Sequence, residues 1–192
     1  NKNEITELTG EAAMIKTGGI NAGTGNQCQV HTVGKPASSF YVYQQVYGAD
    51  GLPLEGVFVD RNNDGNISEE DRYCYKSPAA PYLAGLSARI QYKNWDLGFN
   101  LRGSFGNYVY NDRQADYANV AKRYDSSFAC LQNTTPTAVK NNWKTYSWVL
   151  SDYYVENASF LKMDNLSLGY NFGTIYKGCS LNVSAMVQNV FC

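Results

Sequence analysis

The chain has 192 residues, of which 44% are hydrophobic and 17% charged, so disorder is excluded as its main state. Sixteen Lys and Arg stand against seventeen Asp and Glu, and this balance leaves no basic field that would attract nucleic acid. Sixteen Tyr and seventeen Gly beside only five Pro favour strands and turns over helices.

No run approaches the roughly 18 consecutive apolar residues that a membrane-spanning helix requires. Spanning by strands is not excluded, because a transmembrane strand needs only about ten residues with one apolar face. The chain starts at Asn1 without a Met or a leader and stops at Cys192 inside an apolar alternation. We therefore expect an internal fragment of a longer protein.

The first part of the chain predicts short strands linked by loops. Residues 1–39 are polar and rich in glycine, which predicts a loop that feeds one short strand at 28–33. The β-branched and aromatic run 40–47, the turn 48–51 and the run 52–59 predict a hairpin.

A twelve-residue stretch, 60–71, matches the calcium loop of EF-hand type, with Gly65 at the position of the turn glycine. The predicted ligands, all with side-chain or backbone oxygens, are Asp60, Asn62, Asp64, Asn66, Ser68 and Asp71. Asp71 replaces the usual Glu and reaches a bidentate pose less easily, so we expect weaker affinity. Oxygen ligands without His or Cys predict a structural calcium ion, and the alternative is a merely solvated Asn/Asp/Gly-rich turn.

Four later runs alternate between apolar and polar residues with a period of two, as strands do. Residues 84–92 and 95–105 predict a long antiparallel hairpin with a tight turn between them. Residues 165–172 and 181–188 predict a second hairpin, joined through 173–178.

These strands fit two all-β architectures. Their small hydrophilic second face suits the water-filled lumen of an outer-membrane β-barrel, and Tyr92, Trp95 and Tyr108 suit an interfacial girdle. The alternative is a soluble, calcium-stabilised β-sandwich that binds glycans or proteins at the cell surface. Length and polarity of the strands favour the barrel.

Residues 111–159 interrupt the alternation with a possible helix at 112–124 and a polar, aromatic stretch. A connection of this length is usually functional, and in a barrel it lies on the outer face. Trp143, Tyr146 and Trp148 are the candidate contacts to a ligand or to a lid, because aromatic rings stack on sugars. Packing within the loop is the competing interpretation for each of them.

Two further observations exclude other kinds of site. Five scattered cysteines form no zinc motif and no complete disulfide set, which predicts unpaired thiols: Cys28, Cys74, Cys130, Cys179 and Cys192. A glycan-cleaving enzyme would need two facing carboxylates, and the candidate acids lie in no motif: Asp96, Asp152, Glu156 and Asp164. We therefore predict no enzymatic activity.

Several stretches, in this order and spacing, make nearly the whole chain resemble SusC-like, TonB-dependent outer-membrane transporters of the Bacteroidetes. These stretches are residues 33–43, the loop 60–71, Lys76-Ser77-Pro78, Tyr92-Lys93-Asn94-Trp95-Asp96-Leu97, Gly106-Asn107-Tyr108-Val109-Tyr110-Asn111, residues 157–170 and Val187-Gln188-Asn189-Val190-Phe191.

The resemblance implies that residues 1–192 are part of a large (about 22-stranded) transmembrane β-barrel with long extracellular loops. It also implies a plug, a TonB box and a final strand that this chain lacks. The implied function is import of oligosaccharides or peptides across the Gram-negative outer membrane. The implied partners are a SusD-like surface lipoprotein, the TonB-ExbB-ExbD complex and outer-membrane lipid.

Overall fold

The computed structural model describes residues 2–8, 13–23, 25–118, 124–125, 130–131, 133–145 and 149–192. It divides into two compact units. Unit 1 comprises residues 80–106 and 158–192, and unit 2 comprises residues 2–79 and 107–157. Within the described part of the chain, no helix has the length and apolar character needed to cross a membrane.

Unit 1 contains only strands: β7 (Tyr82–Tyr92), β8 (Trp95–Phe105), β13 (Phe160–Tyr176) and β14 (Cys179–Phe191). Unit 2 contains short strands and helical turns. These are β1 (Met14–Gly19), β2 (Gln27–Thr32), β3 (Ser39–Val42), β4 (Gln45–Tyr47), β5 (Pro53–Phe58), η1 (Glu69–Asp71), β6 (Tyr73–Cys74), β9 (Tyr108–Tyr110), α1 (Asp112–Asp116), β10 (Tyr124–Asp125), β11 (Cys130–Leu131), α2 (Pro136–Asn141), η3 (Asp152–Tyr154) and β12 (Val155–Asn157).

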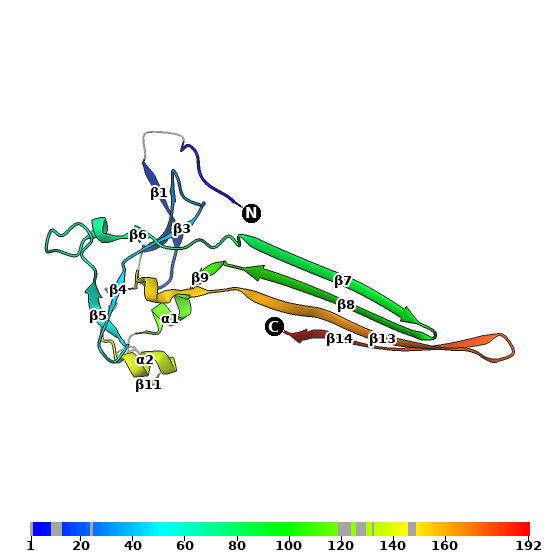
Figure 1. The fold of residues 1–192 in the computed structure, drawn as a ribbon. Helices are drawn as coiled ribbons and strands as arrows, with labels where there is room; N and C mark the ends of the chain where they lie inside the picture. The colour runs from blue at the N-terminus through cyan, green and yellow to red at the C-terminus, as the bar shows by residue number, and fades with distance from the viewer. Residues whose placement is uncertain are drawn as a thin grey trace. The chain divides into compact units, whose positions relative to one another are not determined.

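The four strands of unit 1 form one antiparallel sheet in the order β14-β13-β8-β7 (Figure 1). The β7–β8 pairing runs without a shift from Tyr82, opposite Phe105, to Tyr92, opposite Trp95. A two-residue turn closes it, with Lys93 at a φ of 53°. The predicted hairpin is therefore confirmed, because strict alternation leaves a single register that puts all apolar side chains on one face.

The second hairpin differs from its prediction in where it turns. The expected connection at 173–178 is wrong: β13 continues to Tyr176, and the chain turns at Lys177 and Gly178, both with positive φ. Gly173, with a φ of 72°, lies at a shift in the register with β14. A glycine inside a strand often marks a bulge rather than a turn, and Gly173 does so here.

The apolar face of the sheet is open within unit 1. Leu86, Ile90 and Val183 on this face are 55%, 54% and 52% exposed. A β-sandwich would bury such side chains against a second sheet. The sandwich alternative is therefore wrong, and the strands are those of a single-layered wall.

Unit 2 is built from small sheets. Strands β1, β2, β3 and β6 form one of them, β4 pairs with β5, and β9 pairs with β12. The β4–β5 hairpin was predicted, but the single strand expected before residue 39 is wrong, since β1 pairs with β2 there. Strand β1 was not predicted because it ends in two glycines, Gly18 and Gly19, which are more typical of loops. The predicted helix at 112–124 is shorter, because α1 ends at Asp116, and residues 119–123 lie outside the described part.

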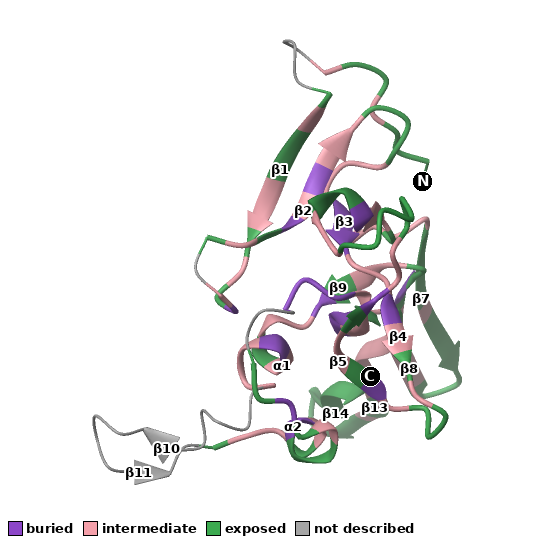
Figure 2. Cartoon of the chain, turned by 90° about the vertical axis from the view of Figure 1, so that its left-hand side faces the viewer, coloured by how far each residue is buried: buried purple, intermediate pink, exposed green. Residues whose placement is uncertain are grey.

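A small core holds unit 2 together, and Figure 2 shows its buried segments on β2, β3, β9 and α2. The core residues are Ala22, Cys28, Phe40, Val42, Tyr110, Ala115, Trp143, Val149, Leu150, Tyr154 and Val155. Cys28, Cys74, Cys179 and Cys192 are free thiols, as predicted, while the side chain of Cys130 lies outside the described residues. Burial raises the pKa of Cys28 to about 11, so this thiol stays protonated and unreactive at neutral pH.

Candidate functional site

The polar face of the unit 1 sheet carries a fixed ion pair. The Nε and Nη2 atoms of Arg89 donate to the two carboxylate oxygens of Asp96 at 2.8 and 2.7 Å. The pair joins β7 to β8 near their common turn, and a bidentate contact of this kind holds both groups in one orientation. It lines a hollow of about 500 Å³ whose other walls include Asn100, Asn165 and Ser167.

A second ionic group lies further along the same sheet. Arg102 on β8 donates from Nε to Asp164 on β13, with an Nε–Oδ1 distance of 3.0 Å. Lys162 lies 4.0 Å from the same carboxylate. Asp164 falls where the register with β8 shifts between Met163 and Asn165, so a bulge presents this carboxylate. These exposed pairs add little to stability, and they leave the face able to hydrogen-bond water or a polar solute.

The candidate metal loop of unit 2 is folded by hydrogen bonds to its own backbone. The two carboxylate oxygens of Asp60 accept from the backbone N–H groups of Asn63 and Gly65, at 2.7 and 2.8 Å. Asp64 accepts from the backbone of Asn66 at 2.7 Å and from the side-chain amide of Asn62 at 2.9 Å. These Asx turns produce the tight path that the spacing of the motif predicts.

Asp71 closes the loop from inside. Its side chain is fully buried, and it accepts from the backbone N–H groups of Ser68 at 2.7 Å and of Arg61 at 2.8 Å. The hydrogen bonds from Ser68 and then from Arg61 favour the charged form and lower the pKa of Asp71. The carboxylate therefore ties the two ends of the loop together as an anion.

The donor set of this loop suits a hard cation, because every predicted ligand atom is an oxygen. Within the described residues, however, no group of three or more His, Cys, Asp or Glu is arranged so that it could hold a metal ion. Asp60 and Asp64 are turned toward backbone amides, yet a carboxylate has about four acceptor sites and keeps some of them available. Calcium at this loop stays a prediction.

One polar contact beside the loop has no signal in the sequence. The hydroxyl of Tyr73 donates to Oδ2 of Asp152 at 2.8 Å, although the two residues are 79 positions apart. The other oxygen of Asp152 accepts from the backbone N–H of Gln45 at 3.0 Å. Burial and then this hydrogen bond raise the pKa of Tyr73. The guanidinium of Arg61 lies 4.7 Å from the centroid of the same ring.

Of the three aromatic residues predicted to contact a ligand or lid, the structure describes Trp143. Trp143 is only 4% exposed, and its indole nitrogen donates to the carbonyl oxygen of Pro53 at 3.2 Å. Its ring lies against Tyr153 and Tyr154 in the unit 2 core. These contacts account for Trp143 as a packing residue, and its contact with a ligand stays a prediction. Tyr146 and Trp148 lie outside the described residues.

The four acids considered for a glycosidase pair each have a partner within their own unit. Asp96 and Asp164 take part in the two ionic groups of the sheet, and Asp152 holds Tyr73. Glu156 accepts from the side-chain amide of Asn111 at 3.0 Å.

The chain has relatives among known proteins, although no family model matches it. Over its whole length the chain is 44% identical to the "TonB-dependent receptor SusC" of Bacteroides thetaiotaomicron, of which it covers 20%. It is 24% identical to the "TonB-dependent receptor P3" of Formosa agariphila over 93% of the chain and 19% of that protein. The chain thus spans about a fifth of the length of the curated relatives it matches.

Solved structures agree with the fold. The RagAB peptide importer in its closed-closed state superposes on 98% of this chain with a TM-score of 0.63 and 18% identity, and the match covers 22% of that chain. A second structure of the RagAB peptide transporter gives a TM-score of 0.63 at 20% identity, with 98% of this chain and 22% of that chain covered. The antiparallel wall of unit 1 is thus part of an outer-membrane receptor barrel, and over its whole length the chain is similar to a segment of a SusC-like TonB-dependent receptor.

Proposed function

We propose that the protein containing this chain imports oligosaccharides across the outer membrane with energy from the TonB-ExbB-ExbD complex. The observation that carries this proposal is the 44% identity to a TonB-dependent receptor over the whole chain. A SusD-like lipoprotein is the proposed partner, as the lid over the outer opening of the barrel. All the relatives named above are receptors or importers, which supports transport without catalysis.

The polar face of unit 1 supports a role in lining the path of a hydrophilic solute. In a transmembrane barrel the strand faces alternate between lipid and lumen, so the face opposite the apolar one is the lumen face. Arg89, Asp96 and Asn100 offer donors and acceptors there without exposing a large apolar surface. Sugars, which carry hydroxyl groups on every ring, are suited to such a surface.

Peptides are the second candidate substrate. The solved structures that share this fold are those of a peptide importer and a peptide transporter, which favours peptides as an alternative. At 18% and 20% identity these structures support the fold alone, so the oligosaccharide proposal, which rests on the hydrogen-bonding polar face of unit 1, comes first.

We also propose that calcium binds the loop 60–71 as a structural ion. The half-buried Asp60 and the exposed Asp64 supply carboxylates and Asn62 a neutral oxygen, as a weak extracellular site requires. The loop already has its backbone hydrogen bonds, so the ion is expected to rigidify this segment rather than to fold it.

Deleting the gene for the full-length receptor tests the proposed function. We expect loss of growth on at least one oligosaccharide from a panel of gluco-, xylo- and mannooligosaccharides as sole carbon source. The wild-type gene should restore growth, but not in a strain that lacks TonB. Normal growth on the whole panel together with loss of growth on peptides would instead identify peptides as the imported substrate. Unchanged growth on both would refute import of either class.

A further inference from the structure

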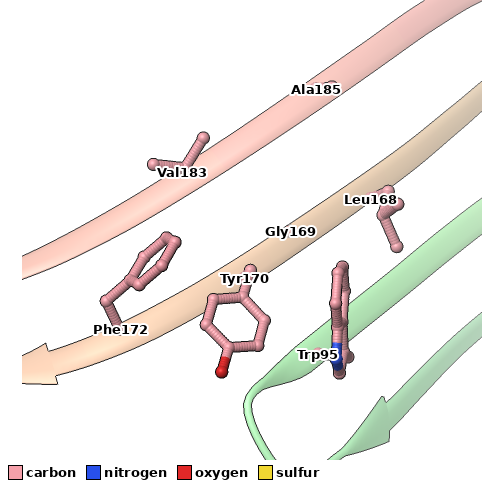
Figure 3. Close-up of a pocket in the computed structure, with 7 residues that line it drawn as sticks. All are labelled: Trp95, Leu168, Gly169, Tyr170, Phe172, Val183 and Ala185. Atoms are coloured by element: carbon pink, nitrogen blue, oxygen red, sulfur yellow. The ribbon is translucent and has the colours of Figure 1, made fainter.

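An apolar groove of about 530 Å³ lies on the apolar face of the unit 1 sheet, opposite the face that carries the ion pairs. Figure 3 shows its lining side chains on β8, β13 and β14. Trp95, Tyr170, Phe172 and Val183 contribute the large groups, whereas Ala185 adds little bulk between them. The volume is within the range of about 300–1,000 Å³ that is usual for pockets that hold small ligands.

The aromatic side chains of the groove have fixed orientations. The rings of Trp95 and Tyr170 meet edge to face at 4.7 Å, and those of Tyr170 and Phe172 meet at 4.6 Å. In Figure 3 the Tyr170 hydroxyl and the Trp95 indole nitrogen both point toward the side of the β7–β8 turn. The groove is therefore amphipathic, with a polar rim at the turn and an apolar interior along the strands.

The groove lies at a step in the sheet. The β7–β8 hairpin ends at Lys93 and Asn94, whereas β13 continues beyond it to Tyr176. The backbone N–H of Asn171 donates to the carbonyl oxygen of Asn94 at 2.8 Å and fixes the position of this step. Beyond Tyr170, β13 is paired with β14 alone, so the shorter hairpin leaves an open shelf beside the groove.

A cation lies in the β7–β8 turn, two residues before the groove residue Trp95. The Nζ of Lys93 is 5.4 Å from the centroid of the Tyr92 ring, and Tyr92 is paired in register with Trp95. None of the residues that line the groove is charged, and Asp96 is turned to the other face, where it binds Arg89. The net charge of the chain is close to zero, so an anion would be attracted here by Lys93 itself and not by the overall charge of the chain.

We propose that this groove is a specific site for a phospholipid with an anionic headgroup. One acyl chain lies over Ala185 between the aromatic side chains, and the phosphate meets Lys93 and the hydroxyl of Tyr170. Aromatic rings with their polar ends at the headgroup level and a lysine beside them are the arrangement that membrane interfaces favour. The defined groove and the step distinguish this site from general contact of a barrel wall with lipid.

Lipid retention by the full-length receptor tests this proposal. The receptor is placed in nanodiscs with equal amounts of phosphatidylglycerol and phosphatidylcholine, extracted with mild detergent, and analysed by native mass spectrometry. We expect phosphatidylglycerol to be retained about fivefold over phosphatidylcholine, which is the preference that one lysine near the headgroup supplies. Equal retention of the two lipids would overturn the proposal.

Two variants and two matched controls locate the site. Lys93→Gln should abolish the preference for phosphatidylglycerol, and Ala185→Leu, which fills the groove, should reduce retention of both lipids. Leu86→Ala removes an apolar side chain from the same face, and Arg89→Gln removes a cation from the other, so both should retain lipid as the wild type does. Equal loss in a control, or unchanged retention in either test variant, would contradict the site. Growth on the imported substrate should be unaffected in Ala185→Leu, which separates this proposal from the proposed function and establishes that the variant folds.

Discussion

Replacement of Trp143 by alanine is expected to destabilise unit 2 by about 3–5 kcal/mol, the usual cost of truncating a buried aromatic residue. The side chain is only 4% exposed, and it contacts Tyr153 and Tyr154. Its loss would also leave the carbonyl oxygen of Pro53 without its indole donor. The measurement is amide hydrogen exchange of the full-length receptor, in which exchange in β5 and β12 should accelerate more than about a hundredfold.

Trp143→Phe is the matched control, because it keeps a buried aromatic ring while removing the indole N–H together with part of the bicyclic ring. We expect its exchange to lie much closer to that of the wild type. If Trp143→Ala instead left exchange unchanged and weakened binding of the imported substrate, the packing role would be wrong. The ligand contact expected for this residue would then stand.

Replacement of Asp71 by alanine is expected to open the loop 60–71 whether or not calcium is present. The variant loses the acceptor for the backbone N–H groups of Arg61 and Ser68, which lie at the two ends of the loop. Donors that are left buried without a partner are costly, so the loop should open rather than keep them. Amide exchange at Arg61 and Ser68 should rise at least about tenfold, with little recovery in millimolar calcium.

Asp64→Ala is the comparison for this loop, since it removes a proposed calcium ligand and leaves the Asp71 contacts in place. It should keep slow exchange at Ser68 without calcium and lose the further protection that calcium adds in the wild type. Full recovery of the Asp71→Ala loop in calcium would contradict the role of Asp71. No effect of calcium on the wild-type loop would contradict the proposed ion.

The pH dependence of the loop follows from the lowered pKa of Asp71. The contribution of this carboxylate to stability is fully present above its unfolded-state pKa of about 3.9. It decreases as the pH falls through the folded-state pKa, which is lower still. Exchange at Arg61 and Ser68 in the wild type, corrected for intrinsic rates, should therefore not vary with pH near neutrality and should accelerate only in acid, where this carboxylate becomes protonated.

The alternating strands could be predicted from sequence because a period of two residues identifies a strand and also shows which side chains share its apolar face. The pairing of Tyr92 with Trp95 follows from the alternation on both sides of Lys93 and Asn94. The turn at Lys177 could not be placed, because Gly173 is the stronger turn signal and only the register with β14 makes it a bulge. Local signals thus identify the strands, whereas their ends depend on pairing.

The candidate site could be predicted only where the residues that form it lie close together in the sequence. The loop 60–71 carries its own spacing, and the side chains of Asp60 and Asp64 accept backbone hydrogen bonds within it. The contact between Tyr73 and Asp152 joins residues from distant segments, and nothing in either segment signals the other. Trp143 is a similar case, since an aromatic residue in a polar stretch has the same sequence signature whether it faces a ligand or a core.

The most direct test of the central claim, that strands β7, β8, β13 and β14 span the outer membrane as part of a receptor, is sided labelling of single cysteines in the full-length receptor. Short turns of such barrels face the periplasm and long connections face the outside. A maleimide on a polymer too large for porins should therefore label Val139→Cys, in the long connection, on intact cells. It should label Cys179, beside the Lys177 turn, only after the outer membrane is broken. Labelling of Cys179 on intact cells, or protection of position 139, would contradict the account.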